Sequence, residues 1–144
     1  MAIVTEIVDP HGPLVNVTLN PSEKFAAERR AAGLPMMTPY PCVALVDTGA
    51  KMSLIGLEAV AALGLETIGT FDLATPTTGR ERKPCRAFAA RFTIAIGGRS
   101  TTKELAAVES DLFHLGVGAI LGRDFLESCL LVYNGPTGEF ALAF

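Results

Sequence analysis

The sequence predicts an all-β domain, and three features of the chain carry that prediction. Short apolar or alternating runs recur along the 144 residues, and they do not alternate regularly with helical segments. The clearest run is 87–96, where apolar residues occupy every second position and Gly97-Gly98 follows as a hairpin turn. A second hairpin is predicted at the end of the chain, with turn residues at 134–138 between the apolar runs 130–133 and 140–144.

The composition indicates one compact domain covering 1–144. Hydrophobic residues make up 49% of the chain and charged residues 19%, which argues against disorder, and a net charge of −3 gives no reason to expect a nucleic-acid partner. No membrane partner is expected, because no stretch approaches the roughly 20 apolar residues of a membrane span. The 3 cysteines are scattered, which favours reduced thiols in a cytoplasmic protein. Neither they nor the 2 histidines suggest a metal site, and no cofactor is expected.

Residues 1–35 are predicted to form an N-terminal extension made of a hairpin and a helix. The runs 2–8 and 14–19 are partly alternating, and the Asp-Pro-His-Gly-Pro sequence between them is typical of a turn, so the two runs are expected to pair. Ser22 is a good N-cap for a surface helix that ends before Gly33.

The core is predicted at 36–144, where a Pro-rich connector leads into a buried strand at 42–46 that ends at Asp47. A helix is expected over 55–63, closed by Gly64. The apolar face of that helix is expected to consist of Ile55, Ala59, Ala62 and Leu63.

The run 67–75 and the alternating run 87–96 are predicted strands on either side of a polar loop at 75–84, a unit that could fold over a cleft. The segments that follow are predicted as a strand at 101–109, a buried strand at 119–121 and a short helix at 123–128.

The most informative stretch is Leu45-Val46-Asp47-Thr48-Gly49-Ala50, where an apolar strand ends in a carboxylate, a hydroxyl and a glycine. A carboxylate at such a place is costly unless it is hydrogen-bonded, paired or used in chemistry. These residues resemble the active-site signature of the retropepsin-type aspartic proteases. The later segment 119–126, Ala-Ile-Leu-Gly-Arg-Asp-Phe-Leu, resembles the second motif of that family. The resemblance covers roughly residues 40–133, and it is closer to single-domain bacterial members than to viral ones.

The resemblance implies a small closed β-barrel with one or two short helices and an active site shared by a two-fold homodimer. Two close carboxylates cannot both ionise easily, so one can act as a base toward water and the other as an acid. The chain has a single Asp-Thr-Gly, so Asp47 would meet its symmetry mate. Thr48 would bond across the interface, and Gly49 would allow close backbone approach. The expected function is an aspartic endopeptidase that cleaves extended polypeptides with an activated water.

The resemblance also implies residues around the catalytic turn. Substrate would be bound by Ala50 and by the tip of the predicted flap, Thr75, Pro76, Thr77, Thr78 and Gly79. The turn would be supported by Ile120, Leu121, Gly122 and Arg123. Viral members carry an acidic residue where this chain has Lys51, and that residue pairs with the later arginine. Arg123 therefore needs a different partner here, either Asp124 or another carboxylate.

Two alternatives to the active enzyme stay open at this level. A non-catalytic dimeric module of the same fold could bind extended peptides or protein partners, and it would tolerate Asp47→Asn. A latent precursor could use residues 1–35 to cover the cleft until they are removed.

Overall fold

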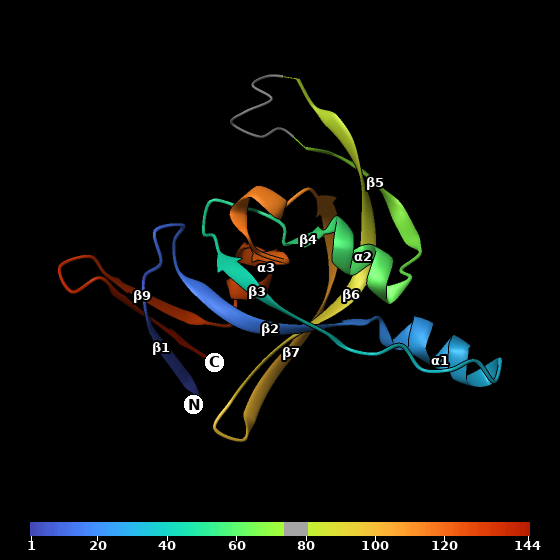
Figure 1. The fold of residues 1–144 in the computed structure, drawn as a ribbon, viewed down its shortest axis with the longest axis horizontal. Coiled ribbons are helices and arrows are strands. Elements are labelled where there is room, and N and C mark those ends of the chain that lie inside the picture. The colour runs from blue at the N-terminus through green and yellow to red at the C-terminus, as the bar shows by residue number, and fades with distance from the viewer. Residues whose placement is uncertain (74–80) are drawn as a thin grey trace.

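The computed structural model describes residues 1–73 and 81–144 and contains a closed β-barrel with a second, smaller sheet (Figure 1). Neighbouring strands around the barrel follow the order β2 (Leu14–Pro21), β3 (Tyr40–Val46), β8 (Ala119–Leu121), β4 (Leu54–Gly56), β7 (Arg99–Ser110) and β6 (Lys83–Ile96). The barrel closes because β2 pairs with β6 as well as with β3. This architecture confirms the predicted all-β class and closed barrel.

The core of the barrel is built from alternating residues of these strands. β6 buries Phe88, Phe92 and Ile94, as its alternation predicts, whereas Ile96 beside the turn is 37% exposed. β2 also faces the core, and its buried members are Val15, Val17 and Leu19. Since β2 lies between β3 and β6, residues 14–21 are part of the barrel. Their removal would open the core, which argues against residues 1–35 being a detachable cover.

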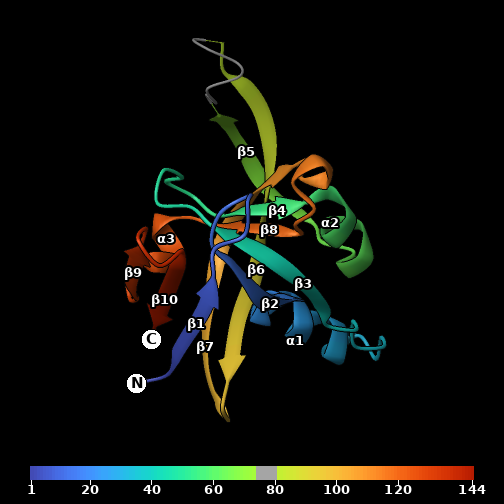
Figure 2. The same ribbon diagram turned by 60° about the vertical axis from the view of Figure 1, so that its left-hand side comes forward.

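The N-terminal strand does not form the predicted hairpin. β1 (Ile3–Ile7) pairs antiparallel with β10 (Glu139–Ala143), and β10 pairs with β9 (Leu130–Asn134), so both chain ends meet in one sheet (Figure 2). The expected pairing of 2–8 with 14–19 is therefore wrong. Alternation shows that a segment is a strand, but it does not show which partner will bury its apolar face. The C-terminal hairpin, by contrast, is confirmed by the pairing of β9 with β10.

The first helix, α1 (Glu23–Ala31), lies where its cap predicts. The Ser22 hydroxyl accepts a hydrogen bond from Phe25 N at 3.2 Å, and Gly33 follows the helix with a φ of +68°. Only Ala26 of this helix is buried, so α1 lies on the surface as expected.

The second helix, α2 (Leu57–Leu63), begins later than predicted. Ile55 belongs to β4 instead, where it is fully buried between β7 and β8. The helix buries Ala59, Val60 and Leu63, and Ala62 is exposed, so Ala62 was wrongly placed on the apolar face. A short apolar run can be a buried strand or a helix, and only the pairing of β4 decides between them.

Two shorter helical segments lie on either side of β8 in the chain. A 3-10 turn (Phe113–Leu115) lies between β7 and β8, and α3 (Arg123–Leu126) follows β8 and ends sooner than the predicted 123–128. Within the described part of the chain, none of the helices is long and apolar enough to cross a membrane.

β6 is long enough to leave the barrel at one end. Its residues from Ala87 to Ile96 pair with β7, and those from Lys83 to Phe88 pair with β5 (Thr67–Leu73). The outer parts of β5 and β6 therefore form a two-stranded arm that projects from the barrel (Figures 1 and 2). The arm comes from the strands that flank the predicted flap loop. Of the predicted loop 75–84, residues 75–80, which include the flap tip 75–79, lie outside the described residues. The loop ends sooner than predicted, because Lys83 and Pro84 pair with β5 as part of β6.

Candidate active site

The Asp47 turn begins where β3 ends between two neighbouring strands. Val46 N donates to Pro13 O at 2.9 Å on the β2 side, and Asp47 N donates to Leu121 O at 3.0 Å on the β8 side. The carboxylate is half-buried, and its Oδ1 accepts a hydrogen bond from Gly49 N at 2.8 Å. The buried strand thus delivers one carboxylate to a turn whose own backbone orients it.

Gly49 lies directly against the carboxylate that it orients. A Cβ at this position would lie 3.0 Å from Asp47 Oδ1, which is tighter than most real contacts. A side chain there would push the carboxylate away from the Gly49 amide. Thr48, between the two, is exposed.

The second motif lies beneath this turn and holds it by backbone contacts. β8 runs parallel to β3, with Ile120 opposite Leu45 and Leu121 opposite Val46. Ala50 packs against an apolar cluster that contains Ile120. Parallel pairing of two strands far apart in sequence therefore brings the two motifs together, as the resemblance implies.

Gly122 allows that close approach. A Cβ on this residue would lie 2.6 Å from the carbonyl carbon of Met52 and 3.0 Å from Ala50 O, both of which are backbone atoms. The next residue, Arg123, donates its N–H to Ala50 O at 2.9 Å. Only glycine fits at this crossing without moving the turn.

Among the described residues, the Arg123 guanidinium contacts the turn itself and not a carboxylate. Its Nη1 donates to Thr48 O at 2.8 Å and is 3.3 Å from Gly49 O. The expectation that Asp124 pairs with Arg123 is wrong, because Asp124 accepts other hydrogen bonds. Lys51, at the position that is acidic in viral members, is exposed. The guanidinium therefore tethers the Asp47 turn through its carbonyl oxygens.

A pair that the sequence analysis missed, Ser53 and Asp124, locks the far end of the turn. Ser53 is fully buried; its Oγ donates to Asp124 Oδ1 at 2.7 Å and accepts from Gly122 N at 3.0 Å. Its backbone N donates to Asp124 Oδ2 at 2.9 Å, and Phe125 N donates to Oδ1 at 2.8 Å. A serine inside an apolar stretch was the available signal, but the sequence could not reveal a partner 71 positions away.

Asp47 lies outside two grooves on the described barrel strands. Two surface grooves, of about 460 and 350 Å³, lie along β2, β3 and β6, and Asp47 lines neither of them. A single half-exposed carboxylate can exchange a proton with water, but it offers no second acid for a leaving group. Among the residues outside 74–80, no group of three or more His, Cys, Asp or Glu side chains is placed to hold a metal ion.

A comparison with protein families matches residues 38–125 to the model described as aspartyl protease. The chain belongs to this family. The matched part of the chain contains the Asp47 turn, the strands β4 to β8 and Gly122 with Arg123. A search of curated proteins finds no significant match.

A solved structure supports the fold of this chain. A retropepsin-like aspartic protease from Rickettsia conorii superposes with a TM-score of 0.53 at 14% sequence identity, covering 99% of this chain and 91% of that one. EIAV protease in complex with the inhibitor HBY-793 is 19% identical over 80% of this chain and 85% of that one, with a TM-score of 0.41. The Rickettsia structure supports the retropepsin-like fold.

Proposed function

We propose that this aspartyl protease is an active endopeptidase that uses Asp47 from each chain of a homodimer. The proposal rests on the way in which the Asp47 turn is fixed. Asp47 Oδ1 accepts a hydrogen bond from Gly49 N, and the turn is tethered from below by Leu121 and Arg123. Two such carboxylates across a two-fold axis share one proton, because both cannot ionise easily at close range. The ionised carboxylate takes a proton from water as the water oxygen bonds to the peptide carbonyl carbon. The C–N bond then breaks, and the protonated carboxyl gives its proton to the leaving nitrogen.

The need for a second copy rests on the single chain having only half of this machinery. The sequence contains one Asp-Thr-Gly, and an isologous interface would place both turns at the axis. The exposed Thr48 hydroxyl would then be free to bond to the other turn. Gly49 would keep the two backbones close.

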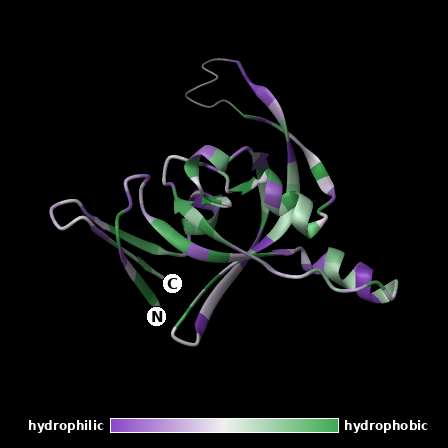
Figure 3. Cartoon of the chain, in the orientation of Figure 1, coloured by the Kyte–Doolittle hydropathy of each residue, from purple (hydrophilic) through white to green (hydrophobic). Residues whose placement is uncertain are grey.

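We propose the sheet of β1, β10 and β9 as the dimer contact. In its register Ile3 lies opposite Ala143, which lies opposite Leu130, and these residues share one face with Val132. Ile3, Leu130 and Val132 are 55%, 58% and 50% exposed, so these three apolar side chains are uncovered in one chain, whereas Ala143 is buried. Figure 3 shows hydrophobic colouring along parts of these strands. Exposed apolar faces of this kind are typical of interaction surfaces.

The proposed substrate is an extended polypeptide that lies between the turn and the β5–β6 arm. An extended chain can add to strand edges by backbone hydrogen bonds. Ala50 would contribute from the turn. The arm tip, Thr75, Pro76, Thr77, Thr78 and Gly79, stays a prediction from the sequence alone. We also propose a reducing, cytoplasmic location, which is supported by the free thiols of Cys42, Cys85 and Cys129.

The test is cleavage of a mixed peptide library by wild type and Asp47→Asn between pH 3 and 7, at several protein concentrations. The proposal expects cleavage that rises more than linearly with protein concentration and disappears in the variant, because a monomer has no complete site. Cleavage that survives in Asp47→Asn would overturn it. Peptide binding by both proteins without cleavage would favour the non-catalytic module instead.

The proposed dimer contact has its own test. Val132→Lys places a charge on the uncovered face of β9, and it should shift the sedimentation profile toward monomer and lower cleavage. Thr137→Lys, in the exposed turn between β9 and β10, is the matched control. A Val132→Lys protein that stays dimeric would show that the copies meet elsewhere.

A further inference from the structure

The β5–β6 arm leaves the barrel at one position of β6, next to Ala87. Ala87 of β6 pairs with Gly69 on one side and with Val108 on the other, so it belongs to both the arm and the barrel. Arg86, one residue further out, has left the ladder with β7 and pairs only with Thr70 of β5. The contacts around Ala87 are therefore the base of the arm.

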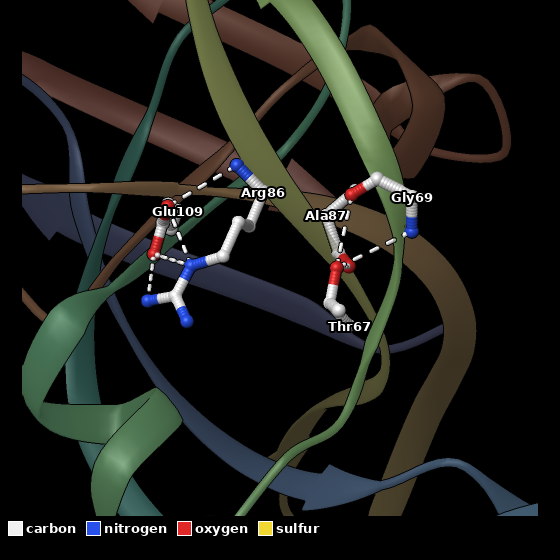
Figure 4. Close-up of polar contacts among 5 residues, drawn as sticks. All are labelled: Thr67, Gly69, Arg86, Ala87 and Glu109. Carbon is white, nitrogen blue, oxygen red and sulfur yellow. Dashed lines mark hydrogen bonds and ion pairs between the residues drawn. The ribbon is translucent and has the colours of Figure 1, made fainter.

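On the β6 side, Arg86 is held by a carboxylate of the barrel. Its Nε lies 2.9 and 3.0 Å from the two oxygens of Glu109, its Nη2 lies 2.7 Å from Oε2, and its backbone N donates to Oε1 at 3.1 Å (Figure 4). Glu109 follows Val108 on β7 and lies opposite Ile55 of β4. Forked contacts of this kind fix geometry as well as adding energy. The Glu109 side chain thus links β6 to β7 beyond the last backbone pair of these two strands.

On the β5 side, a β-bulge lies at the same level. Thr67 pairs with Phe88 and Gly69 pairs with Ala87, so Ile68 is an extra residue on β5. Thr67 Oγ1 accepts from Gly69 N at 3.3 Å and lies 3.2 Å from Ala87 O (Figure 4). A bulge bends its strand, and this side chain fixes the bend against β6.

We infer that Arg86 and Glu109 are positioning residues that set the direction of the arm and, through it, the affinity for the substrate peptide. The inference rests on the proposed function, in which the arm contacts the bound peptide. A two-stranded ribbon is only marginally stable by itself, so its direction depends on its base. Neither residue is placed at the Asp47 turn, and neither takes part in the proton transfers.

The test is hydrogen exchange of the backbone amides of 70–73, 83, 85 and 86 in the full chain, measured without peptide, together with the kinetics of peptide cleavage. In Glu109→Gln these amides should exchange about twofold to fivefold faster, because an ion pair at the surface contributes only modestly to local stability. The value of kcat/KM should fall by a similar factor, mostly through a higher KM. Adding Arg86→Gln should change little more, since the two residues act as one unit.

The matched control is Glu127→Gln, which removes a comparable ion pair, to Lys103 Nζ at 2.9 Å, from β7 without touching the arm. It should leave the exchange of the arm and KM unchanged. Equal effects of the two variants, or unchanged exchange of the arm in Glu109→Gln, would overturn the inference while the proposed function could stand. Faster exchange of the arm in a protein that cleaves nothing would support the anchoring and refute the proposed function.

Discussion

Ser53→Ala is the sharpest test of how the Asp47 turn is supported. The substitution removes only one oxygen, but that oxygen is fully buried and serves both Asp124 and Gly122. The Asp124 carboxylate is half-buried, and water can replace part of the lost bond. The Gly122 N–H is buried and loses its partner outright.

The expected loss of stability follows from these two bonds. A hydrogen bond to a charged group contributes about 1.5–3 kcal/mol, and an unsatisfied buried N–H costs about 1–3 kcal/mol. Because relaxation and water recover part of this sum, Ser53→Ala should lower the free energy of unfolding by about 2–4 kcal/mol. With an unfolding entropy of about 2.1 cal/mol/K per residue over 144 residues, that corresponds to a fall in Tm of about 7–13 °C.

The assay is urea and thermal unfolding followed by circular dichroism at one fixed protein concentration. Ser100→Ala, an exposed serine on β7, is the matched control and should change Tm by less than about 2 °C. Cleavage of peptide should fall further than the loss of folded protein explains, because Ser53 anchors the end of the turn that carries Asp47. A Tm for Ser53→Ala that equals the control would refute the argument that the buried hydroxyl holds the two motifs together.

Three other features of the structure give further predictions. Gly122→Ala should lower the free energy of unfolding by about 1–3 kcal/mol and remove most of the activity, because the new Cβ would clash with the backbone of Met52. Retained activity with an unchanged midpoint of urea unfolding would contradict this. Burial raises the pKa of the Cys42 thiol to about 11, so at pH 8 iodoacetamide should label it about 100-fold more slowly than a thiol of pKa 9.0. The rate is measured by mass spectrometry of the folded protein. Labelling at the free-thiol rate would show that the thiol is not buried. Arg86 lowers the pKa of Glu109 below 4.5, so the pair stabilises the fold above that pH and loses its effect as pH falls through the lowered value. The difference in urea stability between wild type and Glu109→Gln should therefore hold from pH 7 to 5 and shrink below pH 4.5. A difference already gone at pH 6 would contradict the assignment.

Local sequence chemistry decided much of the fold. The Ser22 cap and Gly33 fixed α1, the alternation of 87–96 fixed the core face of β6, and the turn residues at 134–138 fixed the last hairpin. These features depend on residues that are near one another in the chain, and their preferences act within a few positions. The two motifs of the site were also readable, because each is a short contiguous stretch with an unusual chemical composition.

Only the tertiary structure decided which distant segments meet. Alternation could not show that β1 joins β10, and a short apolar run could not show that Ile55 lies in β4. The partner of Arg123 and the buried contact of Ser53 with Asp124 were likewise out of reach, since each joins groups more than 60 positions apart. Pairing, register and satisfaction of buried polar groups depend on the whole barrel closing at once, and no local window of sequence contains that information.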